Sequence, residues 1–412
     1  MEFHKHVLAN GLEVVAECND QAHSAGLGFF VKTGARDETD EIAGVSHFLE
    51  HMVFKGTATR SGDDVNREFD EMGAHYNAGT GEEGTVYYAA VLPECRERVV
   101  ELLADILRPS LRPADFDTEK QVIIEEIRMH EDQPPYGAEE KCRAAHYGDH
   151  PLGRSVYGTV ESITALSVEA MRDYFKRRYS PGNIALVGSG RIDFDALVAD
   201  AERYCGAWEP FEVGRALVPV EQRPGFLVVS KSSAVQQYAV QMAEGPAGTD
   251  EDRYAANLLA TVLGDDSGSR LYWELVDPGR AEHCSLGYWE YDDAGLFMGY
   301  LACDPERAAD NLQRMLDVFR RAERDGISEE ELSQAKSKVA SRIVLSGERP
   351  RNRLFAVGGE WVQRRQYRSV RDLLAAVEAV TCDDVARLLR QYPLSENTTV
   401  SIGPLTALRE PQ

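Results

Sequence analysis

Long apolar runs are missing from this sequence. No stretch of about 18 consecutive apolar residues occurs, which is the length that a helix needs to cross the hydrocarbon core of a bilayer. The opening residues, MEFHKHVLANGLEVV, also lack the charged start, apolar middle and small-residue end of a secretory signal peptide, and they predict a strand instead. We therefore expect a cytoplasmic protein without a membrane partner.

Basic residues are too few for nucleic-acid binding. The 45 Lys and Arg are outnumbered by 69 Asp and Glu, which gives a formal net charge of −24. Phosphate backbones are bound by clustered cations, so nucleic acid is excluded as a partner. The acidic balance is explained either by solubility or by an interior that attracts basic peptides, and the composition alone does not separate the two.

C-x-x-C cysteine pairs are also missing, and histidines are scarce in the second half. The cysteines are odd in number and never form C-x-x-C, so free thiols in a reducing compartment are expected. Only one of the ten histidines, His283, lies beyond residue 150, so a site with two histidine ligands has to lie in the first half. The seven cysteines are Cys18, Cys95, Cys142, Cys205, Cys284, Cys303 and Cys382.

The sequence does contain one order of elements that occurs twice. With 412 residues, 43% of them hydrophobic, the chain is long enough for two domains. Residues 207–224 (AWEPFEVGRALVPVEQRP) carry three prolines and no clear period, which indicates a linker. We predict a first domain at 1–206, this linker, and a second domain of similar fold at 225–412.

Periodicity and turn residues predict the individual elements. Asn10-Gly11 between alternating arms is typical of a hairpin. Strands are predicted near 26–32, 75–77, 85–92, 183–189, 225–231, 237–242, 286–290, 296–301 and 398–402. Helices are predicted at 42–55, 61–72, 93–107, 113–130, 138–147, 168–178, 193–204, 250–263, 269–276, 306–324, 328–346 and 371–391.

Two charged helices support the repeat. PADFDTEKQVIIEEI (113–127) and SEEELSQAKSKVASR (328–342) each follow a long helix and a short turn. Setting Lys120 against Lys336 places Glu126 opposite Arg342, because both lie six residues further on (126 − 120 = 342 − 336). The alternative is that these are two unrelated charged helices.

The stretch SHFLEHMVFKG (46–56) carries the chemistry. His47 and His51 are four residues apart and project from the same helix face, so both imidazoles can bind one metal ion. Glu50 lies close to that face and can reach a water on the metal without being a ligand, the pattern H-x-x-E-H. The composition predicts roughly 0.02 such matches by chance. The alternative is an amphipathic helix whose histidines serve packing.

A catalytic zinc site needs a third protein ligand and an open position for water. The helix with EKQVIIEEIRM is the best source. Glu119 and Glu126 share one face because they are two turns apart, whereas Glu125 points roughly 100° away from Glu126. One carboxylate can bind the metal while another orients a ligand. A charged solvent face remains the alternative for these glutamates.

Three stretches carry a family resemblance. SHFLEHMVFKGT, MGAHYNAGTGEEGTVYY and EKQVIIEEI resemble the M16 peptidases, the insulinase and mitochondrial processing peptidase group, and the chain length resembles the two-domain M16B branch. HPLGRSVYGTVESI (150–163) also resembles a stretch that follows the third ligand. The resemblance is strong over residues 1–190 and loose in the second half.

The resemblance implies a fold and a metal site. It implies an α+β protein with two structurally similar halves, each a mixed sheet covered on one face by helices, facing each other as a clam shell around a chamber. One Zn²⁺ per chain would be bound by His47, His51 and Glu126, which lies 75 residues beyond His51 (126 − 51). Glu119 would be the supporting glutamate of the family.

The resemblance also implies substrate contacts. Asn77, Gly79 and Thr80 match an edge strand that pairs with extended peptide, although a structural hairpin turn is the alternative. The family's second half carries an arginine and a tyrosine seven apart, whereas Arg280 and Tyr288 are eight apart here. Tyr288 is thus a candidate substrate residue, with His283 as a possible substitute.

These observations predict a zinc-dependent endopeptidase that acts on peptides or unfolded segments. Glu50 would be the general base. The alternative is a weakly active or inactive structural or regulatory subunit of a peptidase complex, and the intact set His47, Glu50, His51 and Glu126 argues against it. Besides peptide substrates, the expected partners are a second copy of the chain or a related chain.

Overall fold

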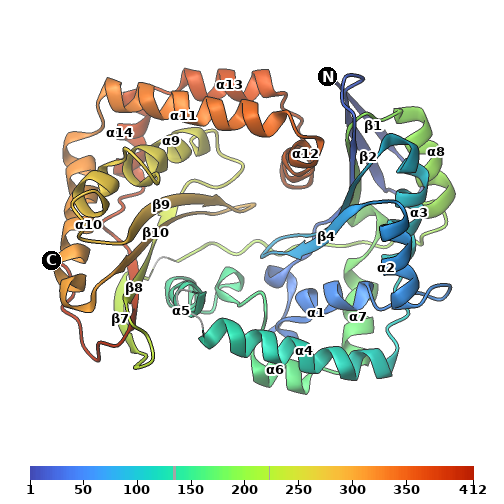
Figure 1. The fold of residues 1–412 in the computed structure, drawn as a ribbon, viewed down its shortest axis with the longest axis horizontal. Helices are drawn as coiled ribbons and strands as arrows, with labels where there is room; N and C mark the ends of the chain where they lie inside the picture. The colour runs from blue at the N-terminus through green and yellow to red at the C-terminus, as the bar shows by residue number, and fades with distance from the viewer. Residues whose placement is uncertain (133–135, 222) are drawn as a thin grey trace. The chain divides into compact units, whose positions relative to one another are not determined.

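The structure, a computed structural model, describes residues 1–132, 136–221 and 223–412. They form two compact units, each assembled from three segments of the chain (Figure 1). These units differ from the contiguous ranges 1–206 and 225–412, because each unit takes one segment from the other half of the sequence. Unit 1 comprises Met1–Arg128, Arg154–Ala216 and Val344–Arg368, and unit 2 comprises Met129–Gly153, Leu217–Ile343 and Ser369–Gln412.

Unit 1 is built on a six-stranded mixed sheet. The predicted Asn10-Gly11 hairpin joins its first two strands, with Gly11 at a φ of 89°. Strand β2 pairs in parallel with β6, and the other pairings are antiparallel. In sheet order the strands are β1 (Glu2–Val7), β2 (Glu13–Cys18), β6 (Ile184–Gly190), β3 (Ala25–Val31), β5 (Thr85–Val91) and β4 (His75–Thr80).

Helices cover both faces of this sheet. The main core lies on one face, where strand residues such as Leu27 and Phe29 pack with apolar residues of several helices. On the opposite face, among the described residues, helix α12 (Pro350–Arg364) packs Leu354, Val357 and Trp361 against the strands. The other helices named for unit 1 are α1 (Val45–Val53), α2 (Gly62–Glu71), α3 (Arg96–Ile106), α4 (Pro113–Asp132), α6 (Val160–Ala165), α7 (Val168–Arg178) and α8 (Phe194–Cys205).

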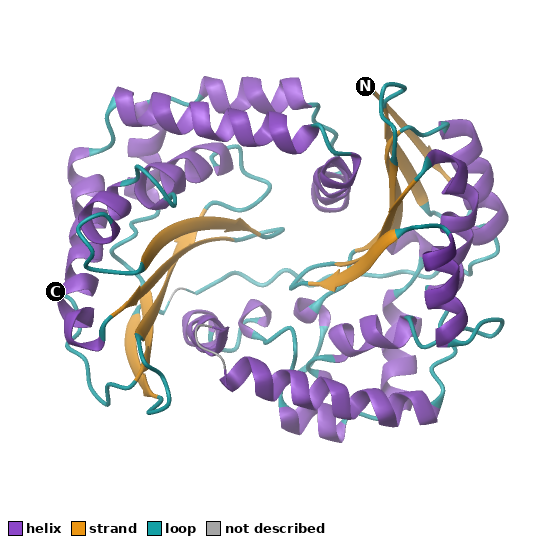
Figure 2. Cartoon of the chain, in the orientation of Figure 1, coloured by secondary structure: helices purple, strands orange, loops and turns teal. Residues whose placement is uncertain are grey.

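Unit 2 repeats this plan on a five-stranded sheet. Its one parallel pair, β7 with β11, matches the parallel pair β2–β6, and its other pairings are antiparallel. In sheet order β7, β11, β8, β10 and β9 therefore correspond to β2, β6, β3, β5 and β4. Figure 2 shows the strands of each unit gathered in one layer with helices beside it. The strands are β7 (Gly225–Ser230), β11 (Thr398–Gly403), β8 (Gln237–Gly245), β10 (Gly295–Cys303) and β9 (His283–Glu290).

One helix from the first half of the sequence completes unit 2. Helix α5 (Tyr136–Tyr147) packs Ala138, Cys142 and Tyr147 on one face of the second sheet, while the main core of the unit lies on the other face. The predicted α+β fold with two similar sheet-and-helix halves is thus confirmed. The remaining helices are α9 (Arg253–Gly264), α10 (Ala308–Asp325), α11 (Glu329–Gly347), α13 (Val370–Ala379) and α14 (Cys382–Gln391).

The two long helices α4 and α11 occupy equivalent places. Helix α4 passes from unit 1 into unit 2 at residue 129, nine residues after Lys120 (129 − 120), and leads to α5. Helix α11 passes from unit 2 into unit 1 at residue 344, eight residues after Lys336 (344 − 336), and leads to α12. We call α5 and α12 the exchanged helices. The two lysines make the same contact. Lys120 Nζ donates to the carbonyl oxygens of Thr164 and Leu166 at the end of α6, at 3.0 and 2.7 Å, and Lys336 Nζ donates to that of Glu378 in α13 at 2.6 Å.

Several structural predictions need correction. The single helix predicted at 371–391 is two helices, because Thr381 caps a new helix, α14, after a break at Val380. The helix predicted at 269–276 is a short π-helix, η6 (Tyr272–Val276). Helices α6 and α12 were not predicted at all. The single covered face implied for each sheet is also wrong, because α12 and α5 cover the second faces.

The first part of the predicted linker is attached to unit 1. Arg215 forms a two-pronged ion pair with Asp37, whose side chain is buried, at 2.9 and 2.6 Å. The Arg178 guanidinium donates to the Gly214 carbonyl at 2.7 Å, and Ser180 Oγ binds the backbone of Phe211. Gln222, within the same predicted linker, lies outside the described residues. Among the described helices, none combines the length and apolar character required to span a membrane.

Candidate metal centre

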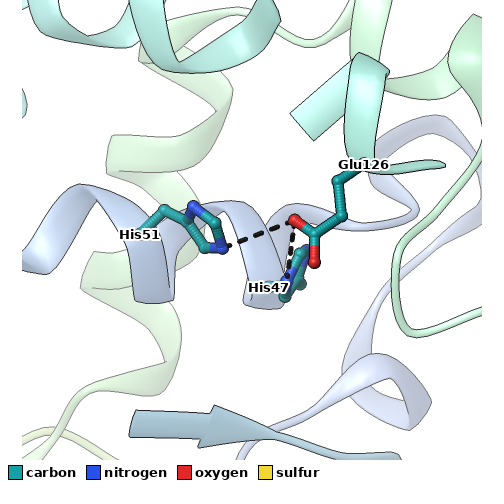
Figure 3. Close-up of side chains that lie close together, drawn as sticks. All are labelled: His47, His51 and Glu126. Atoms are coloured by element: carbon teal, nitrogen blue, oxygen red, sulfur yellow. Dashed lines mark ion pairs between the residues drawn. The ribbon is translucent and has the colours of Figure 1, made fainter. Parts of the chain in front are cut away.

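Helix α1 presents two histidines on one side and an apolar stripe on the other. Phe48, Leu49 and Met52 are fully buried in the main core of unit 1. This packing fixes the helix, and the opposite face directs His47 and His51 toward α4 (Figure 3). His47 is 7% exposed, and the His51 side chain is partly open. The predicted helix at 42–55 is thus present as α1, preceded by a short 3₁₀ turn, η2 (Asp40–Ile42).

Glu126 of α4 lies between these histidines. Its Oε2 is 3.8 Å from His47 Nε2 and 3.7 Å from His51 Nε2, and the three ligand atoms lie within 4.8 Å of one another. Tetrahedral zinc with bonds of about 2.0–2.1 Å holds its ligand atoms about 3.3 Å apart. Two imidazoles and a carboxylate are also ligands that zinc prefers. The residues therefore fit a zinc ion if the two distances to Glu126 shorten by about half an ångström and the two histidine nitrogens approach each other by up to about 1.5 Å.

Glu119 and Glu125 have other roles in the structure. Glu119, 4% exposed, accepts a hydrogen bond from His51 Nδ1 at 2.9 Å and pairs with Lys55 Nζ at 2.6 Å. Its contact with Nδ1 leaves the Nε2 of His51 for a metal. Glu125 is exposed and pairs with Arg128 at 2.6 Å. Of the three glutamates left open by helical spacing, only Glu126 forms a group of candidate metal ligands with His47 and His51.

The charges of this site shift two protonation equilibria in opposite directions. Burial alone would raise the pKa of Glu119, but the hydrogen bonds from His51 and Lys55 outweigh it and lower that pKa below its ordinary value. Burial alone would lower the pKa of His51, but the bond to Glu119 and the charges of Glu50 and Glu126 raise it. An ionised Glu119 is thereby held beside His51, which suits a carboxylate that orients a ligand.

Glu50 is separate from the ligand group. Its Oε2 accepts a hydrogen bond of 2.6 Å from the Thr80 hydroxyl of β4. Burial is the main cause that raises the pKa of Glu50, the nearby Glu126 adds to it, and the Thr80 bond and the charge of His51 oppose it. A raised pKa brings a carboxylate closer to the range in which it exchanges protons at neutral pH.

The predicted peptide-binding residues lie on β4. Within the described part of the chain β4 pairs only with β5, so it is an edge strand. Thr80 points toward Glu50, whereas Asn77 and Gly79 alternate to the other side and are exposed. Asn77 Oδ1 accepts a bond from the Ala78 amide, and a Cβ added at Gly79 would meet no atom within 4 Å. The strand therefore has an open edge.

Tyr288 lies in the other unit. It sits on β9, and its hydroxyl donates to the Pro246 carbonyl at 2.6 Å. Arg280 pairs with Asp310 at 2.6 Å, and His283 Nε2 lies 3.1 Å from Ser285 Oγ. The role of Tyr288 in binding substrate stays a prediction.

Two residues near the site were missed by sequence reasoning. Lys55 pairs with Glu119, and its place four residues after His51 on the same helix face was a usable signal. The Tyr157 ring packs edge-on against His47, with the ring centres 4.9 Å apart. It belongs to the stretch HPLGRSVYGTVESI, whose sequence gave no sign of this contact.

Comparison with known proteins agrees with this geometry. Residues 13–160 match the profile described as "Insulinase (Peptidase family M16)", and residues 165–339 match "Peptidase M16 inactive domain". An "Uncharacterized zinc protease" of Mycobacterium tuberculosis is 33% identical over 407 residues, covering 96% of this chain and 92% of the relative. Another from Bacillus subtilis is 28% identical, with 97% and 98% covered.

Solved structures share the fold at low sequence identity. A protease from Helicobacter pylori superposes with a TM-score of 0.91 at 20% identity, covering 97% of this chain and 99% of that one. A peptidase M16 inactive domain from Pseudomonas fluorescens gives 0.88 at 20% identity, with both chains fully covered. The M16B branch stays a prediction. With two family profiles matching in succession and a relative aligned over nearly its full length, this chain belongs to peptidase family M16.

Proposed function

We propose that this protein is a zinc-dependent endopeptidase that hydrolyses peptides or unfolded segments. The observation that carries the proposal is the convergence of His47, His51 and Glu126, with Glu50 held nearby but outside the ligand group. Zinc bound there would supply a lowered water pKa, toward about 7, and polarisation of the scissile carbonyl.

The protein's own groups have distinct tasks in this reaction. Glu50 takes the proton of the attacking water and passes it to the leaving amine. The Thr80 hydroxyl fixes the orientation of the Glu50 carboxylate through its 2.6 Å hydrogen bond. Glu119 holds the tautomer of His51 that leaves Nε2 free for the metal.

The open edge of β4 provides the peptide-binding surface of the proposal. An extended peptide adds to an edge strand through backbone hydrogen bonds, so sequence preference is broad. Asn77, Gly79 and Thr80 contribute their backbone there, and exposed Gly79 leaves space for a second chain. A clam-shell chamber that admits only flexible segments stays part of the proposal, together with a dimer of this chain or of this chain with a related one.

The decisive experiment measures cleavage of a quenched fluorescent peptide library by wild-type protein and Glu50→Gln. We expect activity to fall by at least about a hundredfold in this variant, since a positioned base contributes about 10²–10⁴. Zinc content should stay near that of wild type. Glu125→Gln is the matched control, because Glu125 is an exposed glutamate with no part in the site. Equal activity in wild type and Glu50→Gln would refute the assigned base.

A second candidate function is that of a weakly active or inactive subunit in a peptidase complex. The observation that favours it is the engagement of Tyr288 and Arg280 within unit 2, by Pro246 and Asp310. A wild-type protein that binds zinc, cleaves no peptide of the library and copurifies with a second M16 chain would support this function and overturn the first.

A further inference from the structure

The metal-binding helix α1 begins without a cap of its own. Its N-cap residue, Gly44, has no side chain to accept the first helical N–H groups and adopts a φ of 89°. The first turn is buried, with Ser46 fully covered and His47 nearly so. Unpaired N–H groups in such a place would destabilise the helix start.

Close packing explains why the N-cap is glycine. A Cβ at Gly44 would lie 2.6 Å from the Tyr157 carbonyl oxygen and 2.9 Å from the Gly158 Cα. The same segment holds the turn by a hydrogen bond of 2.8 Å from Ser162 Oγ to the Ala43 carbonyl. Neither serine nor aspartate, the usual caps, fits at position 44. The stretch HPLGRSVYGTVESI thus packs against the start of α1.

Glu38 provides the missing acceptors from a distance. One carboxylate oxygen accepts the Gly44 amide at 2.7 Å and the other accepts the Ser46 amide at 2.7 Å. The residue is 4% exposed. Burial raises its pKa to about 8, although the bonds from Ser46 and Gly44 and the charge of Arg154 oppose that rise. Both oxygens are committed to the start of α1.

Glu38 also connects α1 to the strand pair that carries Thr80. It directly follows the 3₁₀ turn η1 (Ala35–Asp37), whose amides at Ala35 and Arg36 donate to the carbonyls of Gly81 and Glu82 in the β4–β5 turn, at 3.2 and 2.8 Å. Buried Arg36 adds an ion pair of 2.6 Å to Glu83. The start of α1 and the hydroxyl that holds Glu50 are therefore anchored to the same turn.

We infer that Glu38 is a positioning residue for the candidate metal centre, because it sets where the first turn of α1, and with it His47, lies relative to Glu126. The inference rests on the proposed metal site. Glu38 acts through the backbone of Gly44 and Ser46 and touches neither metal ligand nor substrate.

The test measures metal binding by Glu38→Gln without any peptide. Glutamine keeps the size of the side chain but offers one acceptor, and its NH₂ group would face an amide N–H. We expect zinc affinity, measured by competition with a chromophoric chelator, to fall at least about tenfold, as for other groups that orient ligands. The visible spectrum of the cobalt-substituted protein should also change.

The matched control is Asp193→Asn, which keeps the N-cap acceptor of α8, a helix without metal ligands, but removes the favourable negative charge at the helix start. It should lower thermal stability and leave zinc affinity and the cobalt spectrum unchanged. Wild-type affinity and an unaltered spectrum in folded Glu38→Gln would overturn the inference, as would an equal loss in Asp193→Asn. If Glu38→Gln gives no folded protein, Glu38→Asp replaces it. Aspartate is one methylene too short for both bonds, so a smaller loss is expected and an unchanged affinity overturns the inference.

The outcomes separate this inference from the proposed function. A wild-type protein that binds zinc but cleaves no peptide would overturn the peptidase proposal and leave the role of Glu38 standing. An active wild type with unchanged zinc binding in the folded variant would overturn the role of Glu38 alone.

Discussion

Helices α4 and α11 share a scaffold and differ in chemistry. Lys120 and Lys336 each reach carbonyl oxygens at the end of a neighbouring helix, in unit 1 and in unit 2. Six residues beyond each lysine stands Glu126 in α4 and Arg342 in α11. Glu126 meets two histidines, whereas Arg342 pairs with Asp265 just after α9.

The helix pair is therefore a structural element of both units, and only unit 1 carries the candidate metal site on it. In unit 2 Lys338 also pairs with Asp265, at 2.8 Å, so two cations of α11 form ion pairs where α4 presents the carboxylate of Glu126 to two histidines. The lysine contact is retained in both units because the helix ends need partners regardless of metal. Function resides in a few side chains grafted onto a repeated fold.

The largest effect is expected from removing an exchanged helix. Residues 1–206 expressed alone lack α12, so Phe30 and Val187 lose their cover and buried Glu17 loses its partner Arg353, which donates at 2.8 Å. Breaking such a buried pair costs about 3–5 kcal/mol, before the lost apolar packing is counted. We expect no cooperative thermal unfolding by circular dichroism.

Coexpression with residues 207–412 should restore the fold. A fragment 1–206 that unfolds cooperatively near the wild-type temperature would show that the exchange of α12 is dispensable.

The second-largest effect is expected from Glu126→Arg, which gives α4 the residue type that α11 carries at Arg342. The cation replaces a ligand and repels the metal, so we expect zinc content, measured by elemental analysis, to fall from about one per chain to near zero. The reciprocal Arg342→Glu should not gain a second zinc, because α9 contains no histidine. Retained zinc in Glu126→Arg would contradict the third-ligand assignment.

A pH effect should distinguish the exchanged helices. His146 of α5 is 1% exposed, its Nδ1 lies 3.0 Å from Thr398 Oγ1, and burial, aided by Arg143, lowers its pKa to about 4. The unfolded chain binds the proton more readily, so stability present above about pH 6.5 is lost as pH falls toward 4, by up to about 3 kcal/mol.

Hydrogen exchange at pH 7 and pH 5 measures this loss. After correction for the intrinsic exchange rate at each pH, protection in α5 should fall at pH 5 more than protection in α12, which is held by Arg353 rather than by a histidine. His146→Asn keeps a polar partner for Thr398 and should remove the additional loss of stability in α5 between pH 7 and pH 5. An equal loss of protection in wild type and this variant would assign the acid sensitivity elsewhere.

Smaller effects are expected at the two lysines. Lys120→Met and Lys336→Met each remove hydrogen bonds from a charged group to helix-end carbonyls, worth about 1.5–3 kcal/mol. Lys120 should cost more because it reaches two carbonyls. Urea unfolding measures both, and the double variant should be additive because the sites lie in separate units. Destabilisation by only one of them would break the equivalence of α4 and α11.

The smallest effect is expected from a cut between the units. Limited proteolysis should start within 207–224, and there at exposed Leu217 and Val218 rather than in the segment held by Arg215. The nicked chain should keep its melting temperature, because each fragment contributes a helix to the other unit. Arg215→Ala should widen the cut region toward Phe211. A first cut outside 207–224 would count against the linker.

The metal helix was predictable because its signal is local. His47, Glu50 and His51 stand at helical spacing, and the apolar residues between them define the buried face. The choice of Glu126 needed the family spacing, because helical geometry alone left three glutamates open. The hydrogen bond between Glu119 and His51 joins residues 68 apart and required the fold.

Helix α12 was not predictable for a physical reason. Gly358 and Gly359 interrupt its pattern, and glycine lowers helix propensity by about 1 kcal/mol per residue. The structure shows why one of them is there: a Cβ at Gly358 would lie 2.3 Å from the Phe30 ring. Packing of the helix on the sheet overrides its weak local preference. The capping role of Glu38 was also not predictable, because Glu38 lies six residues before Gly44, whose amide it accepts at the start of α1.

The exchange of α12 has a consequence for synthesis on the ribosome. Val187, the last of the sheet residues it covers, emerges 167 residues before Leu354 (354 − 187). At about 5–20 residues per second, one face of the first sheet waits roughly ten to thirty seconds for its cover. During that interval the nascent chain exposes an apolar strand surface, so we expect it to be a substrate for ribosome-associated chaperones until the last helices emerge.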